Sequence, residues 1–172
     1  MVASTSTDFG SGMKALYVFA YVRAAHTPAT ASFTPASLGL PGSAYVYNYF
    51  TGTGTVLPIG GTFTDTVSSG SYYIVVPIGP SGIGFIGDAG KFVSWGKKRI
   101  SRLTNCGSVQ ATITFATGET SLTMYGYASS QQNITATDGT VSAVIYNRAT
   151  GIFSYPVSPG PDAAATVTRG LT

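Results

Sequence analysis

The sequence has few of the residues with which enzymes and metal sites do their chemistry. Its 172 residues include one histidine, His26, and one cysteine, Cys106. A single cysteine excludes an intramolecular disulfide, although Cys106 can still bridge to another chain. A zinc site needs several His or Cys ligands, and nothing in the sequence motivates a calcium site. We therefore expect no metal and no cofactor.

Charge is also scarce. Charged residues make up 9% of the chain, whereas about 25% is usual for globular proteins. The formal net charge of +3 gives little long-range field, so we expect no nucleic-acid partner. No apolar run approaches the roughly 20 residues that span a bilayer, so we expect no membrane span. A surface of Thr, Ser, Gly and Tyr suits an extracellular or cell-surface protein.

What the sequence does contain is a series of short apolar or alternating segments separated by turn signals. This pattern predicts an all-β fold with almost no helix, built as an antiparallel β-sandwich or as two small sandwiches in series. One helical turn is expected at residues 34–39, with Thr34 as its N-cap and Gly39 ending it. We divide the chain into a Ser/Thr/Gly-rich tail (1–14), a first β half (15–98) and a second β half (99–172). The tail should be mobile unless something holds it. The charge-dense residues 91–102 mark the seam.

Two turns carry specific predictions. Residues 72–77 and 83–86 are apolar throughout, so we expect them to form a hairpin in the centre of a sheet covered on both faces, turned by residues 79–82. The pair Asp138 and Gly139 predicts a two-residue hairpin between residues 133–137 and 141–146.

The acidic residues do not form a convincing catalytic pair. Glycoside hydrolysis needs two carboxyl groups roughly 5 to 10 Å apart. Glu119 and Asp138 fall in predicted turns, where such residues serve backbone geometry, and only Asp65 lies within a strand. His26 lies in a loop with no nucleophile motif beside it. We therefore predict that the protein is not an enzyme. The acids considered are Asp8, Asp65, Asp88, Glu119, Asp138 and Asp162.

Aromatic residues are the better functional signal, with 11 Tyr, 9 Phe and 1 Trp. Tyr45, Tyr47 and Tyr49 share one strand face and are candidate ligand-binding residues, because exposed rings stack against sugars. The alternative, which we favour, is that these rings lie between sheets with only their hydroxyls in water. Trp95 is the best single candidate for an exposed platform, with Tyr125 and Tyr127 behind it.

A basic patch of Lys97, Lys98, Arg99 and Arg102 is a second candidate site. Such a cluster can grip an anionic glycan or a phosphate. The alternative, which we favour, is a solvated loop, because adjacent charges on an extended chain point to opposite faces. Residues 133–135 fit the acceptor sequence for N-glycosylation.

Three motifs in the first half carry a resemblance to a known family. They are Ser37-Leu38-Gly39-Leu40, the Tyr-rich strand of residues 45–52 (YVYNYFTG), and residues 81–86 (SGIGFI). Together they resemble the C-terminal antiparallel β-domain of α-galactosidase (melibiase)-type glycoside hydrolases, over about half of the chain. The catalytic aspartates of that family lie in a barrel that this chain lacks, so the resemblance implies an accessory module rather than a glycosidase.

The sequence thus predicts a non-catalytic extracellular module, carbohydrate-binding or accessory to a glycoside hydrolase, with polysaccharide or glycan as its partner. The alternative is a self-assembling structural subunit of a filament, sheath or capsid. In that case the partners are copies of the same chain, joined by strand addition.

Overall fold

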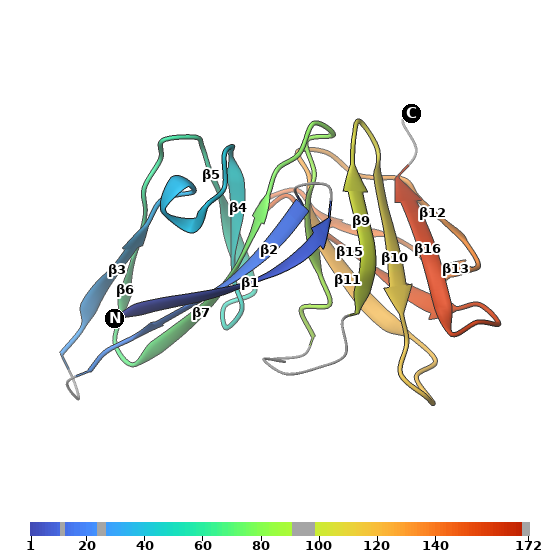
Figure 1. The fold of residues 1–172 in the computed structure, drawn as a ribbon, viewed down its shortest axis with the longest axis horizontal. Helices are drawn as coiled ribbons and strands as arrows, with labels where there is room; N and C mark the ends of the chain where they lie inside the picture. The colour runs from blue at the N-terminus through green and yellow to red at the C-terminus, as the bar shows by residue number, and fades with distance from the viewer. Residues whose placement is uncertain (11–12, 24–26, 91–98, 170–172) are drawn as a thin grey trace. The chain divides into compact units, whose positions relative to one another are not determined.

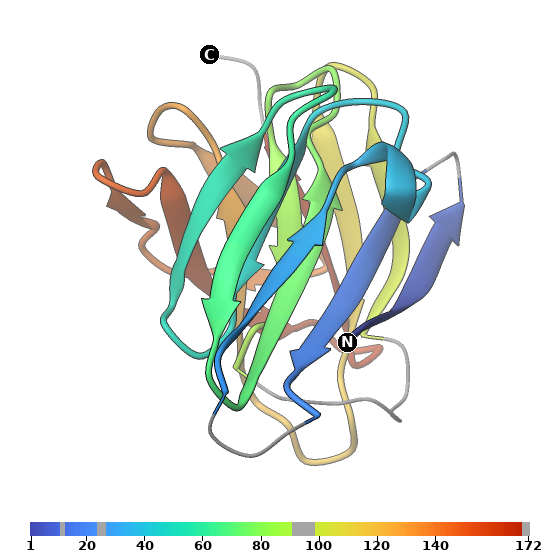
Figure 2. The same ribbon diagram turned by 90° about the vertical axis from the view of Figure 1, so that its left-hand side faces the viewer.

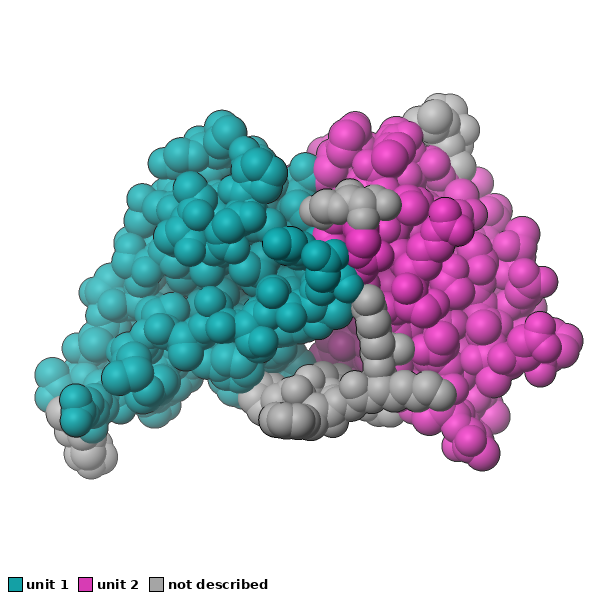
Figure 3. Space-filling view, in the orientation of Figure 1, with its two compact units in different colours: residues 1–8, 14–78 teal, residues 9–13, 79–172 magenta. Residues whose placement is uncertain are grey.

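The computed structural model describes residues 1–10, 13–23, 27–90 and 99–169, and these form sixteen strands and one 3-10 turn (Figure 1). The fold is all-β, as predicted. The chain divides into two compact units, coloured separately in Figure 3. Unit 1 comprises Met1–Asp8 and Lys14–Ile78, and unit 2 comprises Phe9–Met13 and Gly79–Thr172. The division falls after Ile78, earlier in the chain than the seam expected near residue 98.

Unit 1 is built on a five-stranded sheet, which we call sheet A. A two-stranded ribbon of β3 (Ala29–Phe33) and β6 (Phe63–Val67) lies in front of this sheet in Figure 2. The core between the two layers holds Leu16, Val18, Val46, Tyr73 and Val75 from sheet A, and Ala31, Phe33 and Val67 from the ribbon. In order, the strands of sheet A are β1 (Val2–Gly10), β2 (Met13–Tyr21), β7 (Gly70–Pro77), β4 (Ala44–Asn48) and β5 (Thr53–Leu57).

Strand β7 is the central strand that its apolar sequence predicted. It pairs with β2 on one side and with β4 on the other. The four residues from Tyr73 to Val76 are each at most 4% exposed. A run of apolar residues buried on both faces of a sheet explains why this segment lacks polar alternation.

The hairpin predicted from residues 72–86 does not form. The returning segment is β8 (Gly84–Gly87), which pairs with β11 (Leu122–Tyr127) of unit 2 instead of with β7. The turn at residues 79–82 is held within unit 2, because the Asn105 side chain accepts from the Ser81 N–H at 3.2 Å and donates to the Ile83 carbonyl at 3.1 Å. The turn residues therefore mark the passage between units.

Unit 2 is a sandwich of two antiparallel sheets around its own core. The core takes Leu103, Ile113 and Val167 from one sheet, and Phe85, Met124, Phe153 and Tyr155 from the other. The first sheet, in order, contains β12 (Ile134–Thr137), β16 (Ala164–Arg169), β10 (Val109–Thr114) and β9 (Ile100–Asn105). The second contains β13 (Gly139–Val141), β15 (Ile152–Pro159), β11 and β8, with β14 (Ile145–Asn147) also paired to β15.

The predicted hairpin at Asp138 and Gly139 is also wrong. Both residues do have positive φ, 57° and 149°, as the sequence signal implies. The flanking strands, however, join different sheets: β12 pairs with β16, and β13 pairs with β15. The dipeptide is a corner where the chain crosses from one sheet to the other. A Cβ on Gly139 would lie 2.7 Å from that of Ala165, so the corner needs glycine there.

The first residues, expected to be mobile unless something holds them, are held by a neighbouring strand. Residues Val2–Gly10 form β1, at the edge of sheet A. Met1 and Tyr21 exchange two backbone hydrogen bonds, of 2.8 and 3.0 Å. Polar composition did not prevent pairing, because a neighbouring strand supplies the backbone partners. The helical turn is confirmed as η1 (Ala36–Leu38), ended by Gly39 at φ 73°. Its N-cap residue is Pro35 rather than the predicted Thr34, although the Thr34 hydroxyl accepts a hydrogen bond from the Ser37 N–H at 3.0 Å.

Candidate functional site

The three tyrosines of the predicted row share one face of sheet A, opposite Ala44 and Val46, which point into the core of unit 1. Tyr45 is 0% exposed and Tyr47 is 7% exposed, so neither ring can act as a stacking platform. The Tyr45 ring packs over β5, where a Cβ on Gly54 would lie 2.6 Å from it. The platform interpretation is wrong for these two residues, and only Tyr49, which is half-buried, remains a candidate.

Tyr49 belongs to a group of rings that sequence reasoning did not assemble, which we call the aromatic cluster: Tyr17, Phe19, Tyr49, Phe50 and Tyr72. Phe19 of β2 lies directly opposite Tyr72 of β7, and their rings stack at 4.7 Å between centroids. The backbone N–H of Tyr49 donates to the Tyr72 carbonyl at 2.9 Å, and their ring centroids are 5.3 Å apart. The cluster thus crosses three adjacent strands.

The cluster ranges from buried to exposed. Tyr72 lies at its centre and is 5% exposed, while Phe50 is 64% exposed. Phe50 meets the Tyr49 ring edge-on at 5.7 Å, and Tyr17 stacks on Tyr72 at 6.4 Å. Tyr21, 42% exposed, continues the same face of β2 beyond Phe19. An exposed phenylalanine beside other aromatic rings is a patch, which is more informative than an isolated apolar residue.

The cluster combines aromatic faces with phenol hydroxyls and contains no charged side chain. Burial, and then the neighbouring Tyr17 and Tyr49, raise the pKa of Tyr72 well above its ordinary value of 10. The Tyr72 hydroxyl therefore stays protonated at physiological pH and can act as a neutral donor and acceptor. Flat apolar rings bordered by neutral hydroxyls suit a ligand with apolar faces and many hydroxyl groups.

Of the predicted platform residue Trp95 and the two tyrosines expected behind it, the structure describes the tyrosines. Tyr125 and Tyr127 lie on β11, side by side on the face turned away from the core residues Leu122 and Met124, and both are half-buried. The Tyr127 ring covers Gly151, where a Cβ would meet it at 2.6 Å. Trp95, the predicted platform itself, lies outside the described residues.

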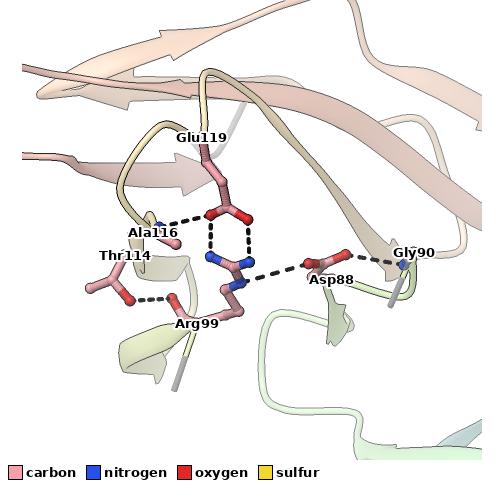
Figure 4. Close-up of polar contacts among 6 residues, drawn as sticks. All are labelled: Asp88, Gly90, Arg99, Thr114, Ala116 and Glu119. Atoms are coloured by element: carbon pink, nitrogen blue, oxygen red, sulfur yellow. Dashed lines mark hydrogen bonds and ion pairs between the residues drawn. The ribbon is translucent and has the colours of Figure 1, made fainter. Parts of the chain in front are cut away.

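The basic patch is not a set of four free cations. Lys97 and Lys98 lie outside the described residues, and Arg102 is exposed on β9. Arg99 makes a two-pronged ion pair with Glu119, and its Nε lies 3.9 Å from Asp88 (Figure 4). The pKa of Arg99 is raised above its usual value, and the largest cause is the hydrogen bond to Glu119. Arg99 thus fits neither interpretation of the patch, because its guanidinium binds a carboxylate of the same chain rather than solvent or an anionic ligand.

This ion cluster ties together three segments of unit 2. Glu119 also accepts from the Ala116 N–H at 2.7 Å, and Asp88 accepts from the Gly90 N–H at 3.1 Å (Figure 4). The backbone carbonyl of Arg99 accepts from Thr114, whose N–H and hydroxyl lie 2.7 and 3.2 Å away. The Arg99 guanidinium thus lies between two carboxylates, each of which also accepts a backbone hydrogen bond. This arrangement is typical of an ion pair that stabilises the fold.

Of the remaining candidate residues, Asp65 takes part in a hydrogen bond within the fold. Asp65, the one acid that the sequence predicted within a strand, lies on β6 and accepts a hydrogen bond from the Tyr73 hydroxyl. Within residues 1–10, 13–23, 27–90 and 99–169 there is no group of three metal-ligating side chains and no helix long and apolar enough to cross a membrane. A cavity of about 20 Å³ in unit 2, between Phe85, Phe153 and Tyr155, has room for about one water molecule and none for a sugar ring. His26 lies outside the described residues.

No protein-family model matches the chain, and no curated protein is a significant match.

Proposed function

We propose that this protein is a non-catalytic β-sandwich module that binds glycan through the aromatic cluster of sheet A. The observation that carries the proposal is the exposed Phe50 ring, which continues a set of rings reaching across three strands. Sugar rings present C–H groups on their faces and hydroxyls at their edges. Aromatic faces with phenol hydroxyls beside them complement both kinds of group.

The absence of charge in the aromatic cluster favours a neutral glycan. An acidic polysaccharide would be favoured by a cation among the rings, and none of the five side chains of the cluster is charged. The resemblance of residues 37–86 to the β-domain that follows the barrel in melibiase-type glycoside hydrolases supports a role as an accessory module. Low charge and a surface rich in Ser and Thr support an extracellular or cell-surface location.

Affinity electrophoresis in gels loaded with neutral polysaccharides tests the proposal. We expect retarded migration on at least one glycan, with binding about tenfold weaker in Phe50→Ala and in Tyr49→Ala, because each loses one aromatic contact. Ile145→Ala is the matched control, since Ile145 is 69% exposed and lies on β14 of unit 2. Unretarded migration on a broad panel, or equal weakening in the control, would contradict glycan binding by the cluster.

One observation favours the second candidate function, a self-assembling extracellular subunit. Strand β1 lies at the edge of sheet A, and Val2 to Ser6 are all exposed. A long exposed edge is the feature through which strands add between copies. A stable monomer at high concentration would count against this function without bearing on the glycan proposal.

A further inference from the structure

Strand β1 differs from the other sheet edges in length and composition. It has nine residues, while the other described edge strands have at most six. Edge strands are usually shielded by lysine, proline or a bulge. Residues 2–10 contain no Lys, Arg or Pro, and their only charge is Asp8. By contrast, edge strand β9 carries the exposed Arg102 and an irregular register with β10, and edge strand β5 ends next to Pro58.

The direction in which the backbone N–H and C=O groups of β1 point follows from the pairing of Met1, the residue just before the strand, with Tyr21 of β2. Met1 and Tyr21 exchange both hydrogen bonds, which is the pattern of a hydrogen-bonded antiparallel pair. Backbone groups alternate in direction along a strand. Those of Ala3 and Thr5 therefore face β2, while those of Val2, Ser4 and Ser6 face away from the sheet.

We propose that this outer edge of β1 binds the β1 edge of a second copy of the chain. The two strands pair antiparallel about a two-fold axis at Ser4, which sets Ser4 opposite Ser4 and Val2 opposite Ser6. The pairing joins two five-stranded sheets into one continuous sheet. This inference deepens the second candidate function by naming the strand and its register, and it does not depend on glycan binding.

A second copy fits this edge because the edge is complementary to itself. Over residues 2–6 the proposed register places only Val, Ala, Ser and Thr opposite one another, and it leaves Asp8 outside the paired segment. Like charges therefore do not meet across the strands, and serine and threonine side chains are suited to cross-strand hydrogen bonds. A two-fold axis makes the same patch serve on both subunits, so this edge joins the chains in pairs.

The substitution Ser4→Pro tests the outer edge of β1. It removes an N–H that faces outward, so it leaves the hydrogen bonds between β1 and β2 in place. Sedimentation velocity over a concentration series should show a dimer for the unmodified chain. Ser4→Pro should weaken the dimer about tenfold or more, because both copies lose a hydrogen bond at the axis. Ser4→Ala keeps the N–H and should dimerise normally, and circular dichroism checks that both variants fold. A monomer throughout the series, or a dimer unaffected by Ser4→Pro, would overturn the proposal.

Cysteine cross-linking tests the register itself, in a Cys106→Ser background that removes the exposed native thiol. Hydrogen-bonded residues facing each other have Cα atoms about 5.5 Å apart, which is within disulfide range. Ser4→Cys should therefore form a covalent dimer on mild oxidation. Ser6→Cys should not, because its two copies would be about 14 Å apart. Cross-linking through residue 6 but not residue 4 would contradict the register, and failure of both would contradict the interface.

Discussion

The hydroxyl of Tyr73 donates a 2.6 Å hydrogen bond to a carboxylate oxygen of Asp65. Tyr73 belongs to β7, the central strand of sheet A, and Asp65 belongs to β6 of the covering ribbon. The Tyr73 ring packs against Phe63 and Phe33 at centroid distances of 5.1 and 5.9 Å. One side chain thus fills the core of unit 1 and also ties its two layers together through a charge-assisted bond.

Replacing Tyr73 with phenylalanine tests that tie. The change keeps the ring and deletes the bond, and it should lower the free energy of unfolding by about 1.5–3 kcal/mol, the usual contribution of a hydrogen bond to a charged group. Urea denaturation measures the loss. Tyr125→Phe in unit 2 is the control and should change stability by less than about 0.5 kcal/mol. Equal effects in both variants would contradict a special role for the Asp65 contact.

Alkaline pH should destabilise the protein through buried tyrosines. Burial, followed by the hydrogen bond to Asp65, raises the pKa of Tyr73 to about 12, and burial also raises the pKa values of Tyr72 and Tyr155. Below pH 10 the folded and unfolded chains both keep these protons. As the pH rises from 10 towards 12, the unfolded chain releases them first, so the free energy of unfolding falls.

Absorbance of tyrosinate during a pH titration measures this directly. We expect a group of tyrosines to ionise late, and Tyr73→Phe should remove one tyrosine from that group. Titration of all the tyrosines near pH 10 in the folded protein would contradict the assigned burial.

The Arg99 ion cluster should stabilise unit 2. Arg99→Met removes the guanidinium and leaves Glu119 and Asp88 without their shared partner, so thermal unfolding should reveal a loss of about 1–3 kcal/mol. Arg102→Met is the matched control on exposed β9 surface and should cost less than about 0.5 kcal/mol. Stability that is unchanged in Arg99→Met would show that the pair contributes nothing measurable.

Gly126 should tolerate no side chain. A Cβ at this position on β11 would lie 2.3 Å from the Phe153 ring, within the core of unit 2. Gly126→Ala should therefore cost about 1–3 kcal/mol through overpacking. Gly42→Ala is the control, because a Cβ there has no neighbour within 4 Å. Equal melting temperatures for the two variants would contradict the packing described for β11 and β15.

The apolar alternation and the turn signals of the sequence predicted where most strands lie. They did not predict which strands pair with one another. Residues 110–115 alternate apolar and polar side chains in the sequence, and the apolar set, Ala111, Ile113 and Phe115, lies in the core of unit 2. The turns after β7 and after β12 were also recognised as turns. A turn signal reports local φ and ψ, but it does not report which sheet the next strand joins, so both hairpin assignments failed.

The aromatic cluster was missed for a related reason. Tyr17 and Phe19 lie on one face of β2, which the period of two residues along a strand is enough to imply. Their contact with Tyr72 depends on the register between β2 and β7, which are separated by about fifty residues of chain. Exposure is likewise a tertiary property, so the row on β4 could not be resolved into the buried Tyr45 and Tyr47 and the half-buried Tyr49.

Glycan binding by the aromatic cluster is tested most directly by nuclear magnetic resonance. Aromatic side-chain resonances, assigned for Tyr17, Phe19, Tyr49, Phe50 and Tyr72, would be followed while a neutral oligosaccharide that retards the protein in gels is added. We predict saturable shifts concentrated in these five rings, with Tyr155 in the core of unit 2 unchanged. Saturable binding that shifts other residues and leaves Tyr49 and Phe50 unmoved would contradict the proposed site.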